Sequence, residues 1–245
     1  MPACLLVGKL FSMNYLVVGG TSGIGLALTN NLLAQGHTVY VVARSNRNLP
    51  DSDNLIFIEG DASAKEFTIG GLPDVLHGLA YCPGSINLKP FNRFTDDDFL
   101  AEYNLNFLGA VRTIRQALPA LKAAQGAAVV LFSTVAAQTG MPFHASIASA
   151  KAAVEGLTRS LAAEYAGANI RFNCIAPSLT DTPLAEKLLA TPEKREASAK
   201  RHPLNKVGTP ADMADAASFL LSANAGWVTG QTLAIDGGMS KLRLL

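Results

Sequence analysis

Residues 15–36 read Tyr-Leu-Val-Val-Gly-Gly-Thr-Ser-Gly-Ile-Gly-Leu-Ala-Leu-Thr-Asn-Asn-Leu-Leu-Ala-Gln-Gly. An apolar run at 15–18 leads into a glycine-rich turn, and the apolar helical stretch at 24–34 is closed by Gly36. Backbone amides at such a turn, together with the positive end of the helix dipole, favour the pyrophosphate of a dinucleotide. The residues expected to contact it are Gly19, Thr21, Ser22, Gly23, Ile24 and Gly25.

The remaining chain alternates between short apolar runs and helical stretches. Strands are expected at 37–43, 55–59, 78–81, 127–132, 170–175 and 232–235, and helices at 96–123, 146–165 and 210–221. This alternation predicts an α/β fold with a three-layer, doubly wound parallel sheet of about seven strands. Residues 1–12 are predicted to be an N-terminal extension and 13–245 a single Rossmann-fold domain, in which 183–201 form a lid over the substrate.

Composition narrows the class of partner. The 245 residues are 49% hydrophobic, and their formal net charge is +1 with scattered basic residues, which predicts neither nucleic-acid nor membrane binding. Cys4, Cys82 and Cys174 have neither disulfide nor metal-ligand spacing, which favours a cytoplasmic protein with no metal site. With nucleic acid and membranes excluded as partners, we expect the substrate to be a small molecule.

The Gly-x-x-x-Gly-x-Gly spacing of residues 19–25 resembles the short-chain dehydrogenase/reductase family, and the resemblance extends from Tyr15 to Gly238. It implies an oxidoreductase with a nicotinamide cofactor and a homo-oligomer, either a dimer or a tetramer. Tyr81-Cys82-Pro83-Gly84 keeps only the glycine of the family's Asn-Asn-Ala-Gly. Further cofactor contacts implied by the resemblance are Asp61, Ala62, Pro83, Gly84, Pro177, Leu179 and Thr182.

The end of the second expected strand bears on cofactor choice. In proteins that bind NAD(H), an Asp or Glu at this position usually forms a hydrogen bond with the free 2′-hydroxyl of the ribose. This chain has Arg44 and Ser45 there instead. Arginine forms charge-assisted bonds with phosphate, so these two residues predict NADP(H). The alternative is that Arg44 is a solvated loop residue.

The resemblance implies four catalytic positions. Lys151 would bind the nicotinamide ribose, Asn106 would hold a proton-relay water, with Asn104 the less favoured asparagine, and Thr134 would take the place of the substrate-binding serine. The family's tyrosine, four residues before the lysine, is replaced by Ile147, which cannot donate a proton.

His144, on the loop before the helix, is the first candidate for the missing acid, since imidazole titrates near neutral pH. Ser146, Ser149 and a bound water are weaker ones. The stretch from Thr134 to Lys151 also partly resembles dienoyl-CoA reductases, which lack tyrosine at the Ile147 position, although their phenol would fall on Ala136.

Two functional hypotheses follow. The first is an NADPH-dependent oxidoreductase that reduces a carbonyl or a conjugated enone or enoyl thioester. The alternative is a non-catalytic NADP(H)-binding protein with a structural or sensing role. The two departures from the family pattern, at Tyr81-Cys82 and at Ile147, favour this alternative, and the retention of Lys151 opposes it.

Overall fold

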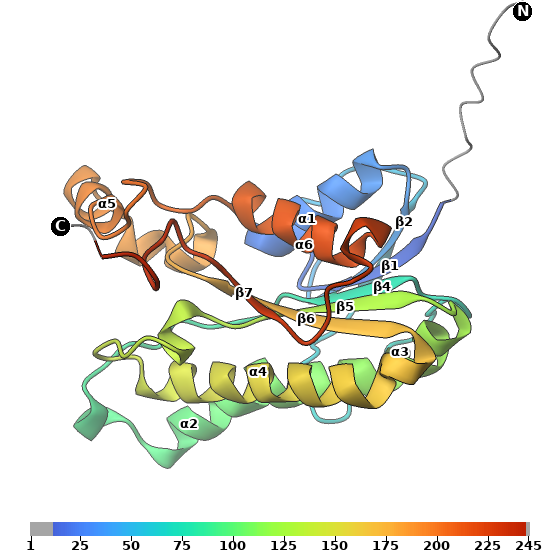
Figure 1. The fold of residues 1–245 in the computed structure, drawn as a ribbon, viewed down its shortest axis with the longest axis horizontal. Helices are drawn as coiled ribbons and strands as arrows, with labels where there is room; N and C mark the ends of the chain where they lie inside the picture. Colours follow the sequence, from blue (N-terminus) through green and yellow to red (C-terminus); the bar gives the residue numbers. More distant parts are fainter. Residues whose placement is uncertain (1–11, 244–245) are drawn as a thin grey trace, which may run out of the picture.

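The computed structural model describes residues 12–243. Seven parallel strands form one sheet in the order β3-β2-β1-β4-β5-β6-β7, which confirms the predicted doubly wound fold (Figure 1). The order reverses between β1 and β4, and ligands of such sheets bind at the carboxyl ends of the strands near this reversal. The strands are β1 (Asn14–Val18), β2 (Thr38–Ala43), β3 (Leu55–Glu59), β4 (Gly78–Tyr81), β5 (Ala127–Phe132), β6 (Ile170–Pro177) and β7 (Thr232–Ile235).

Helices cover both faces of the sheet. In Figure 1, α1 and α6 lie on one face, and α2, α3 and α4 lie on the other. The helices are α1 (Gly23–Ala34), α2 (Asp96–Tyr103), α3 (Gly109–Ala123), α4 (Ala145–Tyr165), α5 (Pro192–Ala199) and α6 (Pro210–Leu221). Short 3₁₀ turns span Phe91–Arg93, Val135–Ala137, Ala166–Ala168, Pro183–Leu188 and Ala223–Ala225. The predicted three layers are therefore present, and the segment from 183 to 201 contains two short helical pieces.

The chain is helical over 96–123, as predicted, but the helix is not regular in its middle. A π-helical turn, Asn104–Leu108, separates α2 from α3. The amide Nδ2 of Asn106 donates to the backbone carbonyl of Glu102 at 2.8 Å, and a side chain inserted into the backbone ladder in this way widens the helix. The widened turn brings Asn106 toward the carboxyl edge of the sheet.

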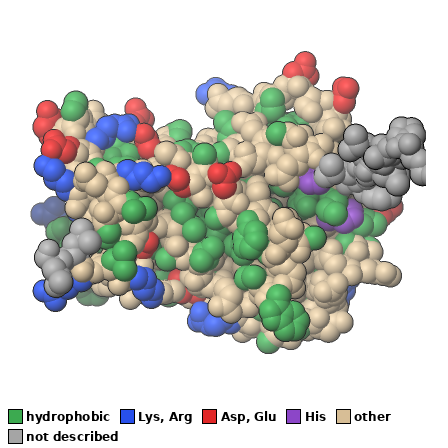
Figure 2. Space-filling model, turned by 45° about the horizontal axis from the view of Figure 1, so that its top comes forward, with side chains coloured by type: hydrophobic (Ala, Val, Ile, Leu, Met, Phe, Trp, Pro, Cys, Tyr) green, Lys and Arg blue, Asp and Glu red, His purple; other side chains and the backbone are tan. Residues whose placement is uncertain are grey.

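The surface on the view of Figure 2 carries no large patch of one charge sign. Lys, Arg, Asp and Glu are intermixed at the end of the molecule that carries α5, and hydrophobic side chains gather over α6 and β7. In the described part of the chain, no helix is long and apolar enough to span a bilayer. The expected N-terminal extension lies almost wholly outside the described residues, as does Cys4.

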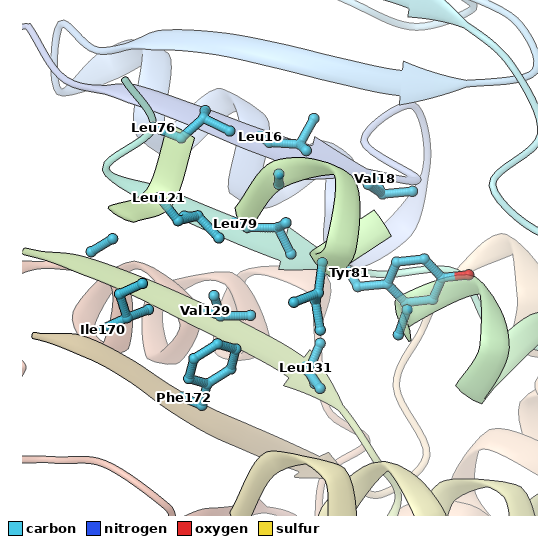
Figure 3. Close-up of a cluster of buried hydrophobic side chains, with 14 of the residues drawn as sticks. Leu16, Val18, Leu76, Leu79, Tyr81, Leu121, Val129, Leu131, Ile170 and Phe172 are labelled. Atoms are coloured by element: carbon cyan, nitrogen blue, oxygen red, sulfur yellow. The ribbon is translucent and has the colours of Figure 1, made fainter. Parts of the chain in front are cut away.

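Burial on both faces of the sheet holds the strand ends in place. Every residue of β4 and β5 is buried, as expected for central parallel strands. Figure 3 shows the cluster between the sheet and α3 and α4, in which Leu79, Val129 and Phe172 lie side by side on neighbouring strands. Because this core is close-packed, the loops that leave the carboxyl ends of the strands start from fixed points.

Candidate active site

The glycine turn forms a cradle for an anion. Gly19 and Gly23 have φ angles of +76° and +50°, which favour glycine. A Cβ on Gly25 would lie 2.2 Å from the carbonyl oxygen of Gly19, so the turn and the helix can approach only without a side chain there. Ser22 makes no side-chain cap, and the first turn of α1 contains no acidic residue, which leaves its amides available to a phosphate.

A cavity of about 640 Å³ extends from this turn across the carboxyl ends of β1 to β4. It has the size and position expected for a dinucleotide. The predicted cofactor residues that line it are Gly19, Thr21, Ser22, Gly23, Ile24, Gly25, Arg44, Ser45, Asp61, Ala62, Pro83, Gly84 and Thr182.

Arg44 and Ser45 lie exposed at one end of this dinucleotide cavity. Asp61 lies in the same lining, and its carboxylate accepts bonds from the hydroxyl and amide of Ser63 at 2.6 and 2.9 Å. These bonds, aided by the charge of Arg44, lower the pKa of Asp61. Within residues 12–243, Asp61 forms no ion pair with Arg44, whose guanidinium is thus available to a ligand.

A second cavity, of about 310 Å³, adjoins the first and is called the reactant cavity. Its walls are mainly apolar and include Ile86, Leu88, Met141 and Met239. The predicted site residues in its lining are Ile24, Gly84, Thr134, His144, Lys151, Pro177, Leu179 and Thr182. Five residues line both cavities: Ile24, Cys82, Gly84, Thr182 and Leu184.

Lys151 is 6% exposed, and its Nζ donates to the carbonyl oxygen of Phe132 at 2.8 Å. An ammonium group has three donors, so further bonds to a ligand remain possible. Burial lowers the pKa of Lys151 to about 8, against the raising effect of Cys174, Glu102 and Cys82. The lysine is therefore a cation at neutral pH that can lose its proton under mildly basic conditions.

Asn106 is the one predicted site residue that lines neither cavity. It lies behind Gly84, where an added Cβ would be 3.6 Å from Asn106 Oδ1 and 3.7 Å from Lys151 Nζ. Its Oδ1 is buried without a hydrogen-bond partner in the described structure. A buried acceptor of this kind calls for a water or ligand donor. The cradle, the bare Cα of Gly84 and this free acceptor together fit a nicotinamide dinucleotide.

Thr134 and His144 present different groups to the reactant cavity. Thr134 Oγ1 accepts from the amide of Ala136 at 3.3 Å, which leaves its own proton free to donate. His144 Nδ1 lies 2.7 Å from the carbonyl oxygen of Pro142, so in the neutral ring this nitrogen carries the proton. His144 Nε2 can then donate only when the ring is protonated.

Ile147 is buried in the wall of the reactant cavity, one helical turn from Lys151, as the sequence predicted. Among the described residues, no tyrosine lines either cavity. Tyr81, at the end of β4 and directly before Cys82 of the cavity lining, is buried, and its hydroxyl donates to the carbonyl of Leu105 at 2.7 Å. Within the described part of the chain, the site therefore has no relocated phenol.

Sequence reasoning missed several residues at the site. Asn104, the less favoured asparagine for binding the relay water, lines the dinucleotide cavity, and its Nδ2 donates to the Ser63 carbonyl at 2.9 Å. Ser85 lines the reactant cavity, and the buried Glu102 contacts Asn106. The signals available were the position of Ser85 directly after Gly84, and the four-residue spacing from Glu102 to Asn106.

The chain matches a family profile described as enoyl-(acyl carrier protein) reductase over residues 18–240. It belongs to the short-chain dehydrogenase/reductase family. Members of this family are NAD(P)-dependent oxidoreductases, so the chain is an enzyme that uses a nicotinamide cofactor and a small-molecule substrate.

Two short-chain reductase relatives cover almost the whole chain. A chloroplastic tropinone reductase homologue of Arabidopsis thaliana is 32% identical, over 95% of this chain and 77% of the relative. The 3-oxoacyl-(acyl carrier protein) reductase of Thermotoga maritima is 31% identical, over 91% of this chain and 96% of the relative. Among solved structures, ElxO with NADP bound has a TM-score of 0.83 and 25% identity, covering 94% of this chain and 100% of that one.

Proposed function

We propose that this short-chain oxidoreductase uses NADPH to reduce a carbonyl, or a conjugated enone or enoyl thioester. The observation that carries the proposal is the position of Lys151. Its buried ammonium lies in the wall of the reactant cavity, beside Gly84, which lines both cavities. Burying a charge is costly without a partner, and a nicotinamide ribose at this junction would supply hydroxyl acceptors.

The cofactor-binding residues divide by cavity. Arg44 and Ser45 would hold a 2′-phosphate at the open end, and the glycine turn would hold the pyrophosphate. Leu179 and Thr182 would hold the carboxamide where the two cavities meet. When bound, the cofactor supplies hydride to the substrate carbon. NADP bound to the structural neighbour ElxO supports the phosphorylated cofactor.

On the substrate side, the Thr134 hydroxyl would donate to the reacting oxygen and so stabilise the charge that develops there. Ile147 contributes hydrocarbon where a proton donor would be needed. We propose protonated His144, or water held near Lys151 and Asn106, as the immediate acid. The apolar walls favour a substrate whose reacting carbonyl is carried on hydrocarbon.

A non-catalytic NADP(H)-binding protein is the alternative, but the matched relatives are named reductases and do not favour it. The discriminating experiment is fluorescence titration with NADPH and NADH, followed by turnover assays on ketones, enones and enoyl thioesters. Tight NADPH binding with oxidation of NADPH by at least one panel member is expected. Tight binding without turnover of any panel member would support the alternative.

Two variants then separate the proposed acids. Lys151→Ala is expected to weaken NADPH binding and abolish turnover. His144→Ala is expected to reduce kcat about 100-fold if imidazole is the acid, because general acid catalysis contributes on this scale. Unchanged kcat in His144→Ala would exclude the histidine and leave the water.

We also propose that the protein is a cytoplasmic homo-oligomer. Support comes from the exposed hydrophobic side chains Phe219, Trp227 and Leu233 in or near α6 and β7, over which hydrophobic groups gather in Figure 2. Cys82 and Cys174 are free thiols, which fits a reducing compartment. Light scattering on the purified chain tests the assembly, and a monomer at micromolar concentration would refute it.

A further inference from the structure

The reactant cavity carries an arginine that the roles assigned above do not use. Arg201 follows the end of α5, is exposed, and lines the reactant cavity but not the dinucleotide cavity. Its Nη2 donates to the Ser198 hydroxyl at 3.3 Å. Within residues 12–243 Arg201 forms no ion pair, whereas the neighbouring Lys200 is paired with Glu196 at 2.6 Å. The positive charge of Arg201 is therefore available to a ligand.

Ser198 supplies a second donor at the same place in the cavity wall. It is 6% exposed and lines the reactant cavity. In its bond with Arg201 the hydroxyl oxygen accepts, and no described residue accepts its proton. A buried donor of this kind calls for an acceptor from water or a ligand. Arg201 and Ser198, called the Arg–Ser pair, thus present N–H and O–H donors side by side.

A buried histidine fixes the Arg–Ser pair to the sheet. His202 is 4% exposed, its Nδ1 lies 2.8 Å from the Ser198 carbonyl oxygen, and its Nε2 lies 2.8 Å from the Ser178 hydroxyl. Ser178 directly follows β6, so these contacts join the end of α5 to the carboxyl edge of the sheet. In Figure 1, α5 and α4 lie on opposite sides of the sheet. The Arg–Ser pair and Lys151 of α4 therefore reach the reactant cavity from opposite sides.

The charges in the lining of the reactant cavity suit an anionic ligand. Among the described residues, no Asp or Glu lines this cavity, whereas His144, Lys151 and Arg201 do. Asp181 lies outside the lining and is paired with Arg195 at 2.6 Å. An acidic group in the cavity would therefore meet cations without a competing carboxylate, and clefts lined by one sign of charge concentrate ligands of the opposite sign.

We infer that Arg201 and Ser198 bind an oxyanion group of the substrate, so that the enzyme selects anionic carbonyl compounds over neutral ones. This assignment rests on the proposed reductase function. The substrate then has a carbonyl or enoyl group at Thr134, an acidic group at the Arg–Ser pair, and hydrocarbon between them along the apolar walls. The guanidinium fork suits both carboxylate and phosphate. A free oxo acid would supply the first, and the phosphate of a carrier-linked thioester the second.

A stabilising role in α5 is the competing explanation, because cations favour the C-terminal end of a helix. Lys200→Gln is the matched control, since it removes a positive charge next to Arg201 but outside both cavity linings. Arg201→Gln removes the charge from the cavity and keeps a polar side chain. Each full-length variant is assayed with NADPH on two pairs of substrates. The first is an oxo acid and its methyl ester, and the second is an oxoacyl thioester of pantetheine with and without its terminal phosphate.

Arg201→Gln should lower kcat/KM at least about 10-fold for the anionic member of one or both pairs, chiefly through KM, and leave the neutral member unchanged. Lys200→Gln should change neither. A loss confined to the oxo acid assigns a free acid as substrate, and a loss confined to the phosphorylated thioester assigns a carrier. Equal losses on charged and neutral members, equal effects of the two variants, or no loss at all would overturn the anion site and leave the reductase function standing.

Calorimetry provides a readout that needs no turnover. The same compounds are titrated into wild type, Arg201→Gln and Ser198→Ala, each saturated with NADP⁺ so that no hydride is transferred. The anionic compounds should bind wild type at least about 10-fold more tightly than Arg201→Gln, with Ser198→Ala between them. Binding that depends on Arg201, without reduction of any substrate by wild type, would overturn the reductase function and keep the anion site. Binding that does not distinguish charged from neutral compounds would overturn the anion site.

Discussion

The phenolic hydroxyl of Tyr81 donates to the carbonyl oxygen of Leu105 at 2.7 Å, and this bond ties the end of β4 to the π turn that carries Asn106. Gly109 accommodates the ring, because a Cβ there would lie 2.0 Å from the hydroxyl oxygen. Burial raises the pKa of Tyr81 well above its usual range, so this phenol remains a donor at any physiological pH.

Tyr81→Phe should therefore destabilise the protein and disturb Asn106. Phenylalanine removes this donor from the part-buried carbonyl of Leu105, and the loss of one such hydrogen bond costs about 0.5–1.5 kcal/mol. Urea unfolding measures the loss, and Tyr40→Phe, in a tyrosine that packs against the same core, is the control. Equal stability of Tyr81→Phe and wild type would show that the bond does not hold the turn.

Ile147→Tyr should gain, or raise, ordinary ketone reductase activity. The new phenol would lie one helical turn from Lys151, inside the reactant cavity, where a neighbouring cation favours its ionisation. Initial rates with NADPH and a small ketone measure the effect, alongside NADPH affinity as a test of folding. A folded, NADPH-binding variant with no increase would contradict the assignment of this position.

Lys151→Met should abolish activity but raise the free energy of unfolding, and the size of this stabilisation should depend on pH. Folding lowers the lysine pKa from 10.5 to about 8, so between these values the unfolded chain binds more protons and stability rises with pH. Below pH 8 the native state bears the full cost of the buried charge, on the order of 3 kcal/mol.

Methionine removes that cost but also the bond to Phe132, so a gain of about 1–3 kcal/mol is expected at pH 7. The gain should fall to nothing near pH 10.5, the pKa of the unfolded lysine. Urea unfolding at pH 7, 9 and 10 checks this, and a difference that does not vary with pH would show that burial of the lysine charge is not the cause.

Gly25→Ala should abolish dinucleotide binding. The added methyl would meet the Gly19 carbonyl at 2.2 Å, which forces the turn and helix apart. Gly70→Ala is the control, since nothing lies within 4 Å of its added carbon. Fluorescence titration with NADPH should show no saturation for Gly25→Ala and wild-type affinity for Gly70→Ala; retained binding in the former would place the pyrophosphate elsewhere.

Arg44→Ala should weaken NADPH binding and leave NADH binding unchanged. Hydrogen bonds to charged groups contribute about 1.5–3 kcal/mol, so the NADPH dissociation constant should rise roughly 10- to 150-fold. Arg47→Ala, in an exposed neighbour outside the cavity lining, is the control. Equal losses for both cofactors would assign Arg44 to another part of the dinucleotide.

The central strands were predictable because they are short apolar runs buried on both faces, as in β4 and β5. The glycine turn was predictable because its positive φ angles and the close approach of turn and helix require glycine. The π turn was not, because its cause is one side-chain bond, from Asn106 to the Glu102 carbonyl. Ser85 escaped notice for the same reason, since its contact with Glu102 joins residues 17 positions apart.

Thr182 lies where the chain leaves β6, and a Cβ on Gly23 would meet its methyl group at 3.2 Å. Thr182 and Leu184 line both cavities, and Ala185 and Leu188 line the reactant cavity. The segment 182–188 therefore covers both the dinucleotide cavity and the reactant cavity. We therefore expect an ordered kinetic mechanism, in which the reduced dinucleotide binds before the substrate and the product leaves before the oxidised dinucleotide. The opening rate of this covering segment would then limit turnover.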